Sequence, residues 1–369
     1  MRIVWFSWKD KKHPLTGGAE LVTDHILTRL AQDGHDVTLL TSRPEGLPPE
    51  DSINGYKVIR HGNRYSVYWQ TAQYYKKHLR GTVDASIEEI NTIPFFTRFY
   101  VKEPSSLFFH QLARQVWFYQ MIWPLSWVGY LIEPLYLRLL NKQRVITVSE
   151  STKQDLVKTA RFKSENIKII REGIELEPLA SLNIDKLPEP TLLSLGSVRP
   201  MKRTADIVKA FEHAKASIPG LKLIIAGDAN DPYGDKVADM VTNSPYKDDI
   251  SLLGRVSIEE KYDLMRRAHV MAVTSVKEGW GLIVTEANSQ GTPVVAYDVD
   301  GLRDSVKHGR TGIVTAPNPG ALGDSIIQLL SDNKTYSTMR EAAWEDSKQY
   351  TFDNLYNDFL AASGLFDRR

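Results

Sequence analysis

Short apolar runs rich in Val and Ile alternate with longer helix-periodic segments through almost the whole chain, and this alternation constrains the fold more than any other feature. Strands that read as continuous apolar runs are buried on both faces, as in parallel sheets covered by helices. The sequence therefore predicts an α/β fold. In the first half, the expected strands are 3–7, 37–41, 58–61, 85–89, 107–110 and 145–148.

The pattern breaks once, at a stretch where prolines stand among polar residues with no clear period, and then restarts. We expect an N-terminal domain over 1–172, a linker over 173–190, a C-terminal domain over 191–350 and a final helix over 351–369 that returns to the N-terminal domain. The C-terminal domain is expected to contain six strands, in the stretches TLLSLGSV, LKLIIAGD, DISLLGRV, HVMAVTS, TPVVAYDV and TGIVTA.

Two doubly wound sheets facing each other across a cleft would bind a ligand at the carboxyl ends of their strands. One such strand end leads into EGWGLIVTEA, residues 278–287. Gly279 and Gly281 would let a ligand approach the backbone, and a helix that starts near Gly281 leaves its first amides free to bind phosphate oxygens. The alternative is a tight turn with a capping glutamate. In the anion-binding interpretation, the amides that bind phosphate are those of Trp280, Gly281, Leu282 and Ile283.

A carboxylate stands at each end of this anion-binding stretch, at Glu278 and at Glu286. The two charges are compatible with a phosphate site if the anion is only the middle of the ligand. A nucleotide sugar carries hydroxyl groups on both sides of its diphosphate, and an ionised carboxylate is a strong acceptor for paired hydroxyls. We therefore expect each glutamate to face a diol of a nucleotide sugar.

The stretch 278–287 resembles the glutamate-seven-glutamate motif of retaining glycosyltransferases of family 4, which have the two-domain GT-B fold. Three other stretches match the family in order and place: TGGAE at 16–20, VSEST at 148–152 and GTPVV at 291–295. The resemblance covers nearly the whole chain and is weakest over 43–84 and beyond Thr335. It implies a GT-B architecture built from two Rossmann-like domains.

The resemblance also implies a pair of cations beside the diphosphate. In the family, the strand that opens the second domain is followed by Gly, an Arg and a later Lys, and here Gly196 and Lys202 match. Ser197 stands where the arginine usually is, and Arg199 is the expected replacement. Two cations would stabilise the charge on a departing diphosphate in place of a metal ion. The alternative is a solvated helix start.

Further residues follow from the same resemblance. His110, at the end of a strand, matches a family histidine near the transferred sugar, although a lone histidine at such a place is more often structural. Gly17 and Gly18 would approach the diphosphate from the first domain. The loop expected to meet the nucleotide base through its backbone consists of Gly254, Arg255 and Val256.

Several kinds of chemistry are not supported by the sequence. The chain has no cysteine, which excludes thiolate zinc sites and cysteine nucleophiles, and its formal charge of +1 gives no reason to expect nucleic acid. Neither a GxGxxG nor a GxxxxGK[ST] loop follows a strand. Asp228 and Asp231 stand in a turn without further clustered ligands, so we expect no metal site.

The segment 116–140 is unusually rich in Trp, Tyr, Leu and Ile. Pro124, Glu133, Pro134 and Arg138 interrupt it, which argues against a bilayer span. Core helices and an amphipathic face that rests on a membrane or a lipid-linked acceptor both remain open. The N-terminal apolar run is too short for a signal peptide, so we expect a cytoplasmic chain starting at Met1, with or without contact to the membrane.

The expected function is a retaining glycosyltransferase. It would move a sugar from a nucleotide diphosphate sugar, with UDP or GDP, to the hydroxyl of a glycan or lipid-linked acceptor, without a metal cofactor. Retention of the anomeric configuration is implied by the resemblance. Two alternatives stay open: a nucleotide-sugar epimerase on the same fold, and an inactive subunit that only binds nucleotide sugars or glycans.

Overall fold

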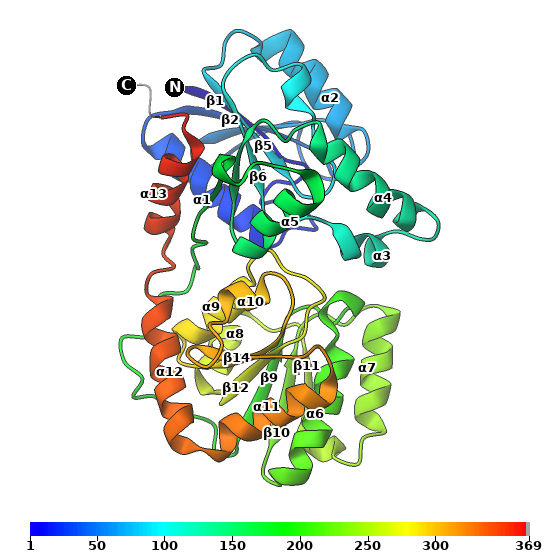
Figure 1. Ribbon diagram of the computed structural model, residues 1–369, viewed down its shortest axis with the longest axis vertical. Coiled ribbons are helices and arrows are strands. Elements are labelled where there is room, and N and C mark those ends of the chain that lie inside the picture. Colours follow the sequence, from blue (N-terminus) through cyan, green and yellow to red (C-terminus); the bar gives the residue numbers. More distant parts are fainter. Residues whose placement is uncertain (367–369) are drawn as a thin grey trace. The chain divides into compact units, whose positions relative to one another are not determined.

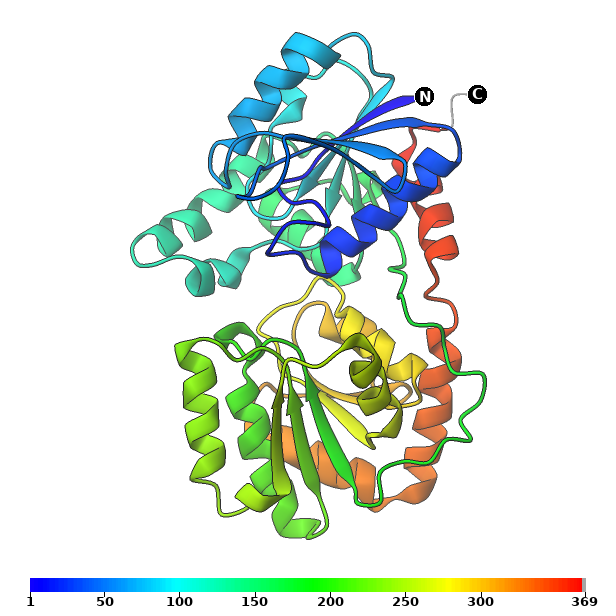
Figure 2. The same ribbon diagram turned by 180° about the vertical axis from the view of Figure 1, so that it is seen from behind.

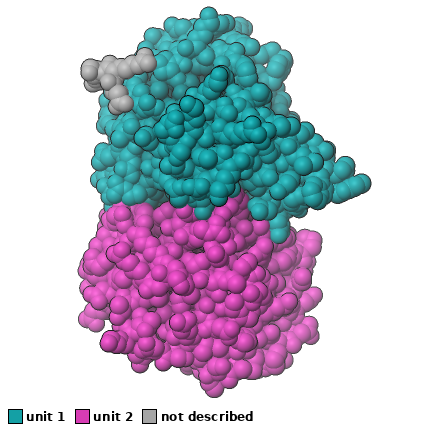
Figure 3. All heavy atoms as spheres, viewed as in Figure 1, with its two compact units in different colours: residues 1–173, 351–369 teal, residues 174–350 magenta. Residues whose placement is uncertain are grey.

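The structure, a computed structural model, describes residues 1–366 and divides them into two units (Figure 3). Unit 1 comprises 1–173 together with 351–366, and unit 2 is Ile174–Tyr350. Each unit is a mainly parallel sheet covered by helices, so the predicted α/β class is confirmed. The chain passes from unit 1 to unit 2 after Gly173 and returns to unit 1 after Tyr350.

Unit 1 contains a sheet of eight strands in the order β3-β4-β2-β1-β5-β6-β7-β8. All neighbours are parallel except β3 and β4. The six strands predicted for this half are present, and β3 and β8 are additional. The bounds are β1 Arg2–Phe6, β2 Asp36–Thr41, β3 Glu50–Ile53, β4 Tyr56–Arg60, β5 Ala85–Ile90, β6 Ser105–Phe109, β7 Arg144–Thr147 and β8 Ile167–Ile169.

The helix nearest the C-terminus completes unit 1. Helix α13 (Phe352–Ser363) lies beside α1 (Gly18–Gln32) in both views (Figures 1 and 2). The ring of Phe359 packs on Trp5 of β1 with centroids 5.7 Å apart, and Ser106 Oγ donates to Ser363 O (2.9 Å). The other helices are α2 Val67–Tyr74, α3 Trp117–Gln120, α4 Leu125–Arg138 and α5 Glu150–Ala160.

Unit 2 contains six strands, all parallel, in the order β11-β10-β9-β12-β13-β14, and each predicted strand is present. The strands are β9 Thr191–Leu195, β10 Lys222–Ala226, β11 Ile250–Gly254, β12 Val270–Val273, β13 Val294–Tyr297 and β14 Gly312–Thr315. The helices are α6 Thr204–Ser217, α7 Pro232–Thr242, α8 Ile258–Arg267, α9 Leu282–Ser289, α10 Leu302–Ser305, α11 Pro319–Ser331 and α12 Asn333–Ser347.

The stretch expected as a linker over 173–190 is, from Ile174 onward, part of unit 2. Lys186 Nζ reaches the carbonyl oxygens of Ala268 (2.8 Å) and Gly291 (2.9 Å), beyond the ends of α8 and α9. Leu179 N donates to Ser289 O (3.0 Å). A proline-rich stretch without period reads as a free connection, but these long-range bonds hold it on the surface of unit 2.

In each sheet, the strand order reverses at one point, between β1 and β5 in unit 1 and between β9 and β12 in unit 2. Ligands of open α/β sheets bind outside the carboxyl ends of the strands at such a switch point. The loops after β1, β9 and β12 are therefore the places to look for a site. These loops carry Gly17, Lys202 and Glu278 respectively.

The apolar segment 116–140 forms α3 and α4. In the part of the chain that the structure describes, no helix combines the length and apolar character needed to cross a membrane.

Candidate functional site

The exit loops of five neighbouring strands in unit 2 are joined by backbone hydrogen bonds along one edge of the sheet. The bonds run from Gly227 N to Gly254 O (2.7 Å), from Gly196 N to Ala226 O (3.0 Å), from Val276 N to Met201 O (2.8 Å) and from Glu278 N to Asp300 O (3.0 Å). All site residues that the sequence predicts in unit 2 lie on these loops or on the first turns of α9.

Lys202 and Glu278 meet at this edge. Lys202 Nζ lies 2.5 Å from Glu278 Oε1, and Ser275 Oγ donates to the same oxygen (2.6 Å). Burial would raise the pKa of Glu278, but the Lys202 charge, these hydrogen bonds and the Arg199 charge lower it below its usual value. Glu278 is therefore ionised, and an ammonium and a carboxylate stand together after β9 and β12.

Helix α9 begins beside this ion pair. Gly281 caps it with φ 94°, a left-handed conformation that suits glycine. Val284 N is the first amide to bond within the turn, to Gly281 O (2.8 Å), so the amides of Leu282 and Ile283 precede the helical ladder. The predicted helix start is confirmed, and these amides give the turn the chemistry of an anion site.

The side chain of Trp280 turns back on its own helix. Its Nε1 donates to Thr285 Oγ1 (2.9 Å), and its ring packs on Tyr350 with centroids 5.4 Å apart. These two contacts of the indole stabilise the turn between Gly279 and Gly281.

Glu286 lies lower on α9 and is 8% exposed. Lys261, on α8, places Nζ 2.7 Å from Glu286 Oε2. Burial raises the pKa of Glu286 above its usual value, and the Lys261 charge and hydrogen bond oppose this shift. Each of the two predicted glutamates thus has a lysine partner.

The loop after β13 supports the Glu278 loop from the other side. Asp300 binds Lys277 Nζ through Oδ2 (2.5 Å) and Arg303 Nη1 through Oδ1 (2.5 Å). Gly301 has φ 80°, and a Cβ built on it would lie 2.4 Å from Glu278 O. The two backbones approach so closely that only glycine fits here.

The remaining predicted residues of unit 2 are exposed or half-buried. Gly196 (φ 125°) and Gly254 (φ 66°) have open space where a side chain would be. Ser197, Arg199 and Arg255 are exposed, and Val256 is half-buried. The positive charge of Arg199 lowers the pKa of Glu278. The expected replacement for the family arginine therefore lies within electrostatic range of the ion pair.

His110 of unit 1 follows β6 and is buried. Its Nε2 lies 3.5 Å from Glu89 Oε1, and its Nδ1 lies 3.4 Å from Glu172 Oε1. Burial alone would lower the pKa of His110, but the hydrogen bonds and charges of these two carboxylates raise it to about 10. Both ring nitrogens therefore face protein carboxylates, which favour the protonated ring.

Gly17 and Gly18 form the N-terminus of α1 and are exposed. The amide of Gly17 donates to Glu20 Oε2 (2.7 Å), and Glu20 Oε1 lies 3.0 Å from Lys9 Nζ. The first turn of α1 thus already holds a carboxylate of its own chain. His110 and the two glycines lie on different exit loops of the unit 1 sheet, after β6 and β1.

No cluster of three or more His, Asp or Glu residues suited to a metal ion is found among residues 1–366. Asp231 Oδ1 instead accepts from Gly234 N (2.8 Å) as the cap of α7, and Asp228 Oδ1 accepts from Asn230 N (3.3 Å).

Sequence reasoning missed four polar partners: Ser275, Lys261, Glu89 and Glu172. Ser275 stands directly before the predicted motif and could have been found as a strand-end residue. Glu89 stands beside Glu88 within the predicted buried strand, in SIEEI at 86–90, where a carboxylate is unusual. Lys261 is one of many charged residues on an exposed helix face, and no sequence signal distinguishes it.

Two family models match the chain. The model described as Glycosyltransferase Family 4 matches residues 16–178, and the model described as Glycosyl transferases group 1 matches residues 182–346. A relative of known activity, D-inositol 3-phosphate glycosyltransferase of Corynebacterium glutamicum (strain R), is 28% identical over 249 residues. The match covers 61% of this chain and 59% of that protein, so the chain spans less than two thirds of the relative's length.

Solved structures resemble the complete fold. Sucrose-phosphate synthase from Thermosynechococcus elongatus has a TM-score of 0.77 at 19% identity and covers 97% of each chain. Anabaena HepE, solved in complex with UDP and glucose, has a TM-score of 0.70 at 18% identity and covers 99% of each chain.

Proposed function

Because the chain belongs to the group 1 glycosyltransferases of family 4 and has their GT-B fold, we propose that it transfers a sugar from a nucleotide diphosphate sugar to an acceptor hydroxyl. The observation that carries the proposal is the convergence at one sheet edge of the α9 N-terminus, Lys202 and Glu278. Amides and an ammonium suit a diphosphate, and a carboxylate beside them suits sugar hydroxyls.

In the proposed reaction, the diphosphate is the leaving group. The bond from the anomeric carbon to the diphosphate oxygen breaks while the acceptor oxygen attacks from the same face, and the acceptor proton moves to the departing phosphate oxygen. Lys202, Arg199 and the amides of Leu282 and Ile283 stabilise the growing negative charge without a metal ion. Retention of configuration follows from this front-face geometry.

The remaining roles are assigned by the same proposal. Glu286 and Glu278 accept hydrogen bonds from hydroxyls of the two sugars that flank the diphosphate. Gly254, Arg255 and Val256 contact the base through backbone groups. Gly17, Gly18, Gly196 and Ser197 contact the diphosphate, and His110 lies near the transferred sugar. The base is uracil or guanine, and UDP in the related Anabaena structure supports uracil.

We further propose that the protein is cytoplasmic and meets a lipid-linked acceptor at a membrane surface through the apolar hairpin, defined as residues 117–139. The hairpin projects from unit 1 as α3 and α4 (Figures 1 and 3). Its exposed large apolar side chains are those of Phe118, Tyr119, Ile122, Trp123, Leu125, Trp127, Val128, Leu131, Ile132, Leu135 and Leu139.

The root of the apolar hairpin is polar and fixed. Glu133 is 1% exposed and accepts from the amides of Ala113 and Arg114 (both 2.8 Å) and from Trp117 Nε1 (3.2 Å). A Cβ on Gly129 would lie 2.4 Å from the Trp117 ring, so α3 and α4 pack closely. The apolar face is therefore presented by two closely packed helices, and the carboxylate of Glu133 is buried beneath it.

A lipid surface fits this face better than a protein partner. A protein interface usually has a polar rim, whereas Glu133, which is buried, is the one charged residue in the sequence between Arg114 and Arg138. Trp and Tyr among aliphatic side chains suit the headgroup region. Basic residues outnumber acidic ones over 1–173, and the reverse holds over 174–350, which favours anionic lipid for unit 1.

Flotation with vesicles tests the membrane proposal. Wild-type protein should float with vesicles of phosphatidylglycerol and phosphatidylcholine, and the double variant Ile122→Ser, Leu131→Ser should stay in the soluble fraction. Trp69→Ser, which changes an exposed tryptophan on α2 of the same unit, should float like wild type. Equal flotation of wild type and the double variant, or a wild-type dimer that the double variant dissociates without any flotation, would refute membrane contact.

Incubation with radiolabelled UDP and GDP sugars tests the reaction itself. Transfer to a lipid or glycan acceptor, or slow release of the donor's own sugar, should be detectable with pure protein. Donor alone that is converted into an isomeric sugar would favour an epimerase, and binding without transfer or hydrolysis would favour an inactive subunit. NMR of the anomeric proton of the product distinguishes retention from inversion.

A further inference from the structure

Four charge pairs in succession tie the loop between β1 and α1 to the rest of unit 1. In these pairs Lys9 meets Glu20 (3.0 Å), Asp10 meets Arg60 (2.6 Å), Lys11 meets Asp24 (2.7 Å) and Lys12 meets Asp51 (2.8 Å). A connection from a strand to a helix usually has about two to six residues. This loop runs over 7–17 and is longer, so it needs anchors to keep one conformation.

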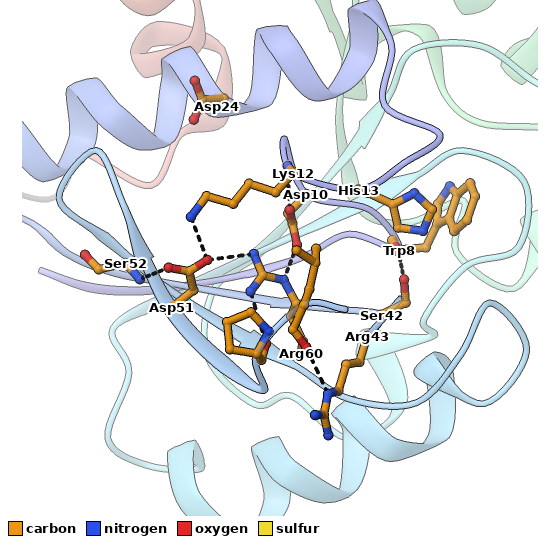
Figure 4. Close-up of polar contacts among 12 residues, drawn as sticks. Trp8, Asp10, Lys12, His13, Asp24, Ser42, Arg43, Asp51, Ser52 and Arg60 are labelled. Atoms are coloured by element: carbon orange, nitrogen blue, oxygen red, sulfur yellow. Dashed lines mark hydrogen bonds and ion pairs between the residues drawn. The ribbon is translucent and has the colours of Figure 1, made fainter. Parts of the chain in front are cut away.

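The pair of Asp10 and Arg60 is the buried anchor (Figure 4). Both side chains are 0% exposed, and Arg60 Nε donates to Asp10 Oδ2. The guanidinium also donates to Pro48 O and Asp51 Oδ2 (both 3.1 Å). A buried ion pair adds little stability over an apolar pair, but separating its partners is costly because it leaves an uncompensated buried charge. The pair therefore fixes where the loop lies above β4.

A continuous series of hydrogen bonds carries this fixed geometry towards Gly17. Asp10 Oδ1 accepts from Lys12 N (2.7 Å), and Asp10 O accepts from His13 N (3.0 Å). His13 then accepts from Leu15 N through Nδ1 (3.0 Å) and from Thr16 N through its carbonyl (2.9 Å). The His13 ring also packs on Trp8, with centroids 5.3 Å apart.

We propose that Asp10 and Arg60 are positioning residues, which hold the loop so that the N-terminus of α1 at Gly17 and Gly18 can receive the donor diphosphate in place of the Glu20 carboxylate. This role rests on the proposed function. The lysines of the loop are each engaged by a carboxylate, so the loop offers the diphosphate backbone groups and little free positive charge. A misplaced loop would then cost donor affinity.

The variant Asp10→Asn tests the role of the pair. Asparagine keeps the size of the side chain and an oxygen for the Lys12 amide, but it removes the charge that Arg60 binds. We expect KM for the donor to rise about tenfold with kcat within about twofold of wild type, because the lost interaction acts on donor binding. Hydrogen exchange of 8–18 should be faster in the variant without any nucleotide.

Glu103→Gln is the matched control. Glu103 accepts from Gly81 N (2.8 Å), and both residues precede the amino ends of strands in the same sheet, β6 and β5. The variant Glu103→Gln should lower the unfolding temperature of the protein and leave KM for the donor unchanged. If Asp10→Asn does not fold, Asp10→Ser keeps an acceptor for Lys12 N and leaves room for water beside Arg60.

Two results would overturn the inference, and they differ from failure of the proposed function. An unchanged KM in the Asp10 variant, or an equal rise in Glu103→Gln, would reduce the pair to a general structural role. Wild-type protein that neither binds nor uses any nucleotide sugar would instead refute the proposed function and this role with it.

Discussion

The ion pair of Lys202 and Glu278 sets the charge that a departing diphosphate would meet. The two groups lie 2.5 Å apart and nearly cancel each other in the absence of ligand. A bound diphosphate would compete with Glu278 for the ammonium, and the sugar would occupy the carboxylate. Binding would thus separate the pair and leave each charge to its own part of the donor.

We expect Lys202→Ala to lower kcat by about 10²- to 10³-fold, the usual loss when one group that stabilises a developing charge is removed. Steady-state kinetics with saturating donor measures the effect. Lys209→Ala, which changes an exposed lysine on α6, should behave as wild type. A kcat for Lys202→Ala within about threefold of wild type would remove Lys202 from the site.

His110 predicts a pH dependence of stability. Its folded pKa is raised to about 10 by Glu172 and Glu89, above the value near 6.5 of an unfolded histidine. The proton therefore stabilises the fold fully below about pH 6.5, and this contribution is lost as the pH rises through about 10.

The difference in the free energy of unfolding between wild type and His110→Gln should shrink by at most roughly 1.4 kcal/mol per pH unit across this window. Denaturant unfolding at about pH 6 and about pH 9 measures it. A constant difference for His110→Gln would show that the ring is neutral.

Among the loops, the contact of Gly301 with the Glu278 backbone gives a sharp stability test. Gly301→Ala must place a Cβ 2.4 Å from Glu278 O, with φ 80°. We expect a loss of more than the roughly 1–2 kcal/mol of left-handed strain, together with reduced turnover, because the Glu278 loop must move. Gly309 has φ 74° and open space where a Cβ would be, so thermal unfolding of Gly309→Ala measures the backbone strain alone. Equal losses in both variants would contradict the close approach.

The strands show what the sequence can predict. All twelve predicted strands are present, and each reads as a short apolar run in the sequence. Most of them are buried on both faces, whereas the edge strand β11 is exposed after Ile250. β3 was missed because EDSI is polar, although Asn54 and Gly55 before β4 form a typical hairpin turn signal. β8 has only three residues, which is too short for a period.

The site was predicted in part. The loops after β9 and β12 could be found because strand ends and glycines are local signals. The partners of the charged residues could not be found in this way, because they are far apart in the sequence. Lys202 and Glu278 are separated by 76 residues, and His110 and Glu172 are separated by 62 residues. Such pairs depend on which strands become neighbours in the sheet, and a single sequence carries no direct record of that order.

Nucleotide binding should raise the free energy of unfolding of the protein. A ligand that binds only the folded state adds about 2.7 kcal/mol at a concentration of 100 Kd. We expect UDP or GDP, but not both to the same extent, to raise the unfolding temperature, and Glu286→Ala to reduce the shift. Differential scanning calorimetry with UDP, GDP and ADP measures this. If no diphosphate raises the unfolding temperature, the anion site on α9 is wrong.

The return of α13 to unit 1 also has a consequence for synthesis on the ribosome. Unit 2 is one uninterrupted stretch of chain, whereas Trp5 contacts Phe359 near the far end. Cotranslational folding usually completes the N-terminal domain first, but unit 1 includes α13, so we expect the residues of unit 2 to be complete before those of unit 1. We expect the side of Trp5 that packs on Phe359 to stay uncovered on the nascent chain until α13 emerges, which would make it a target for chaperones that bind nascent chains.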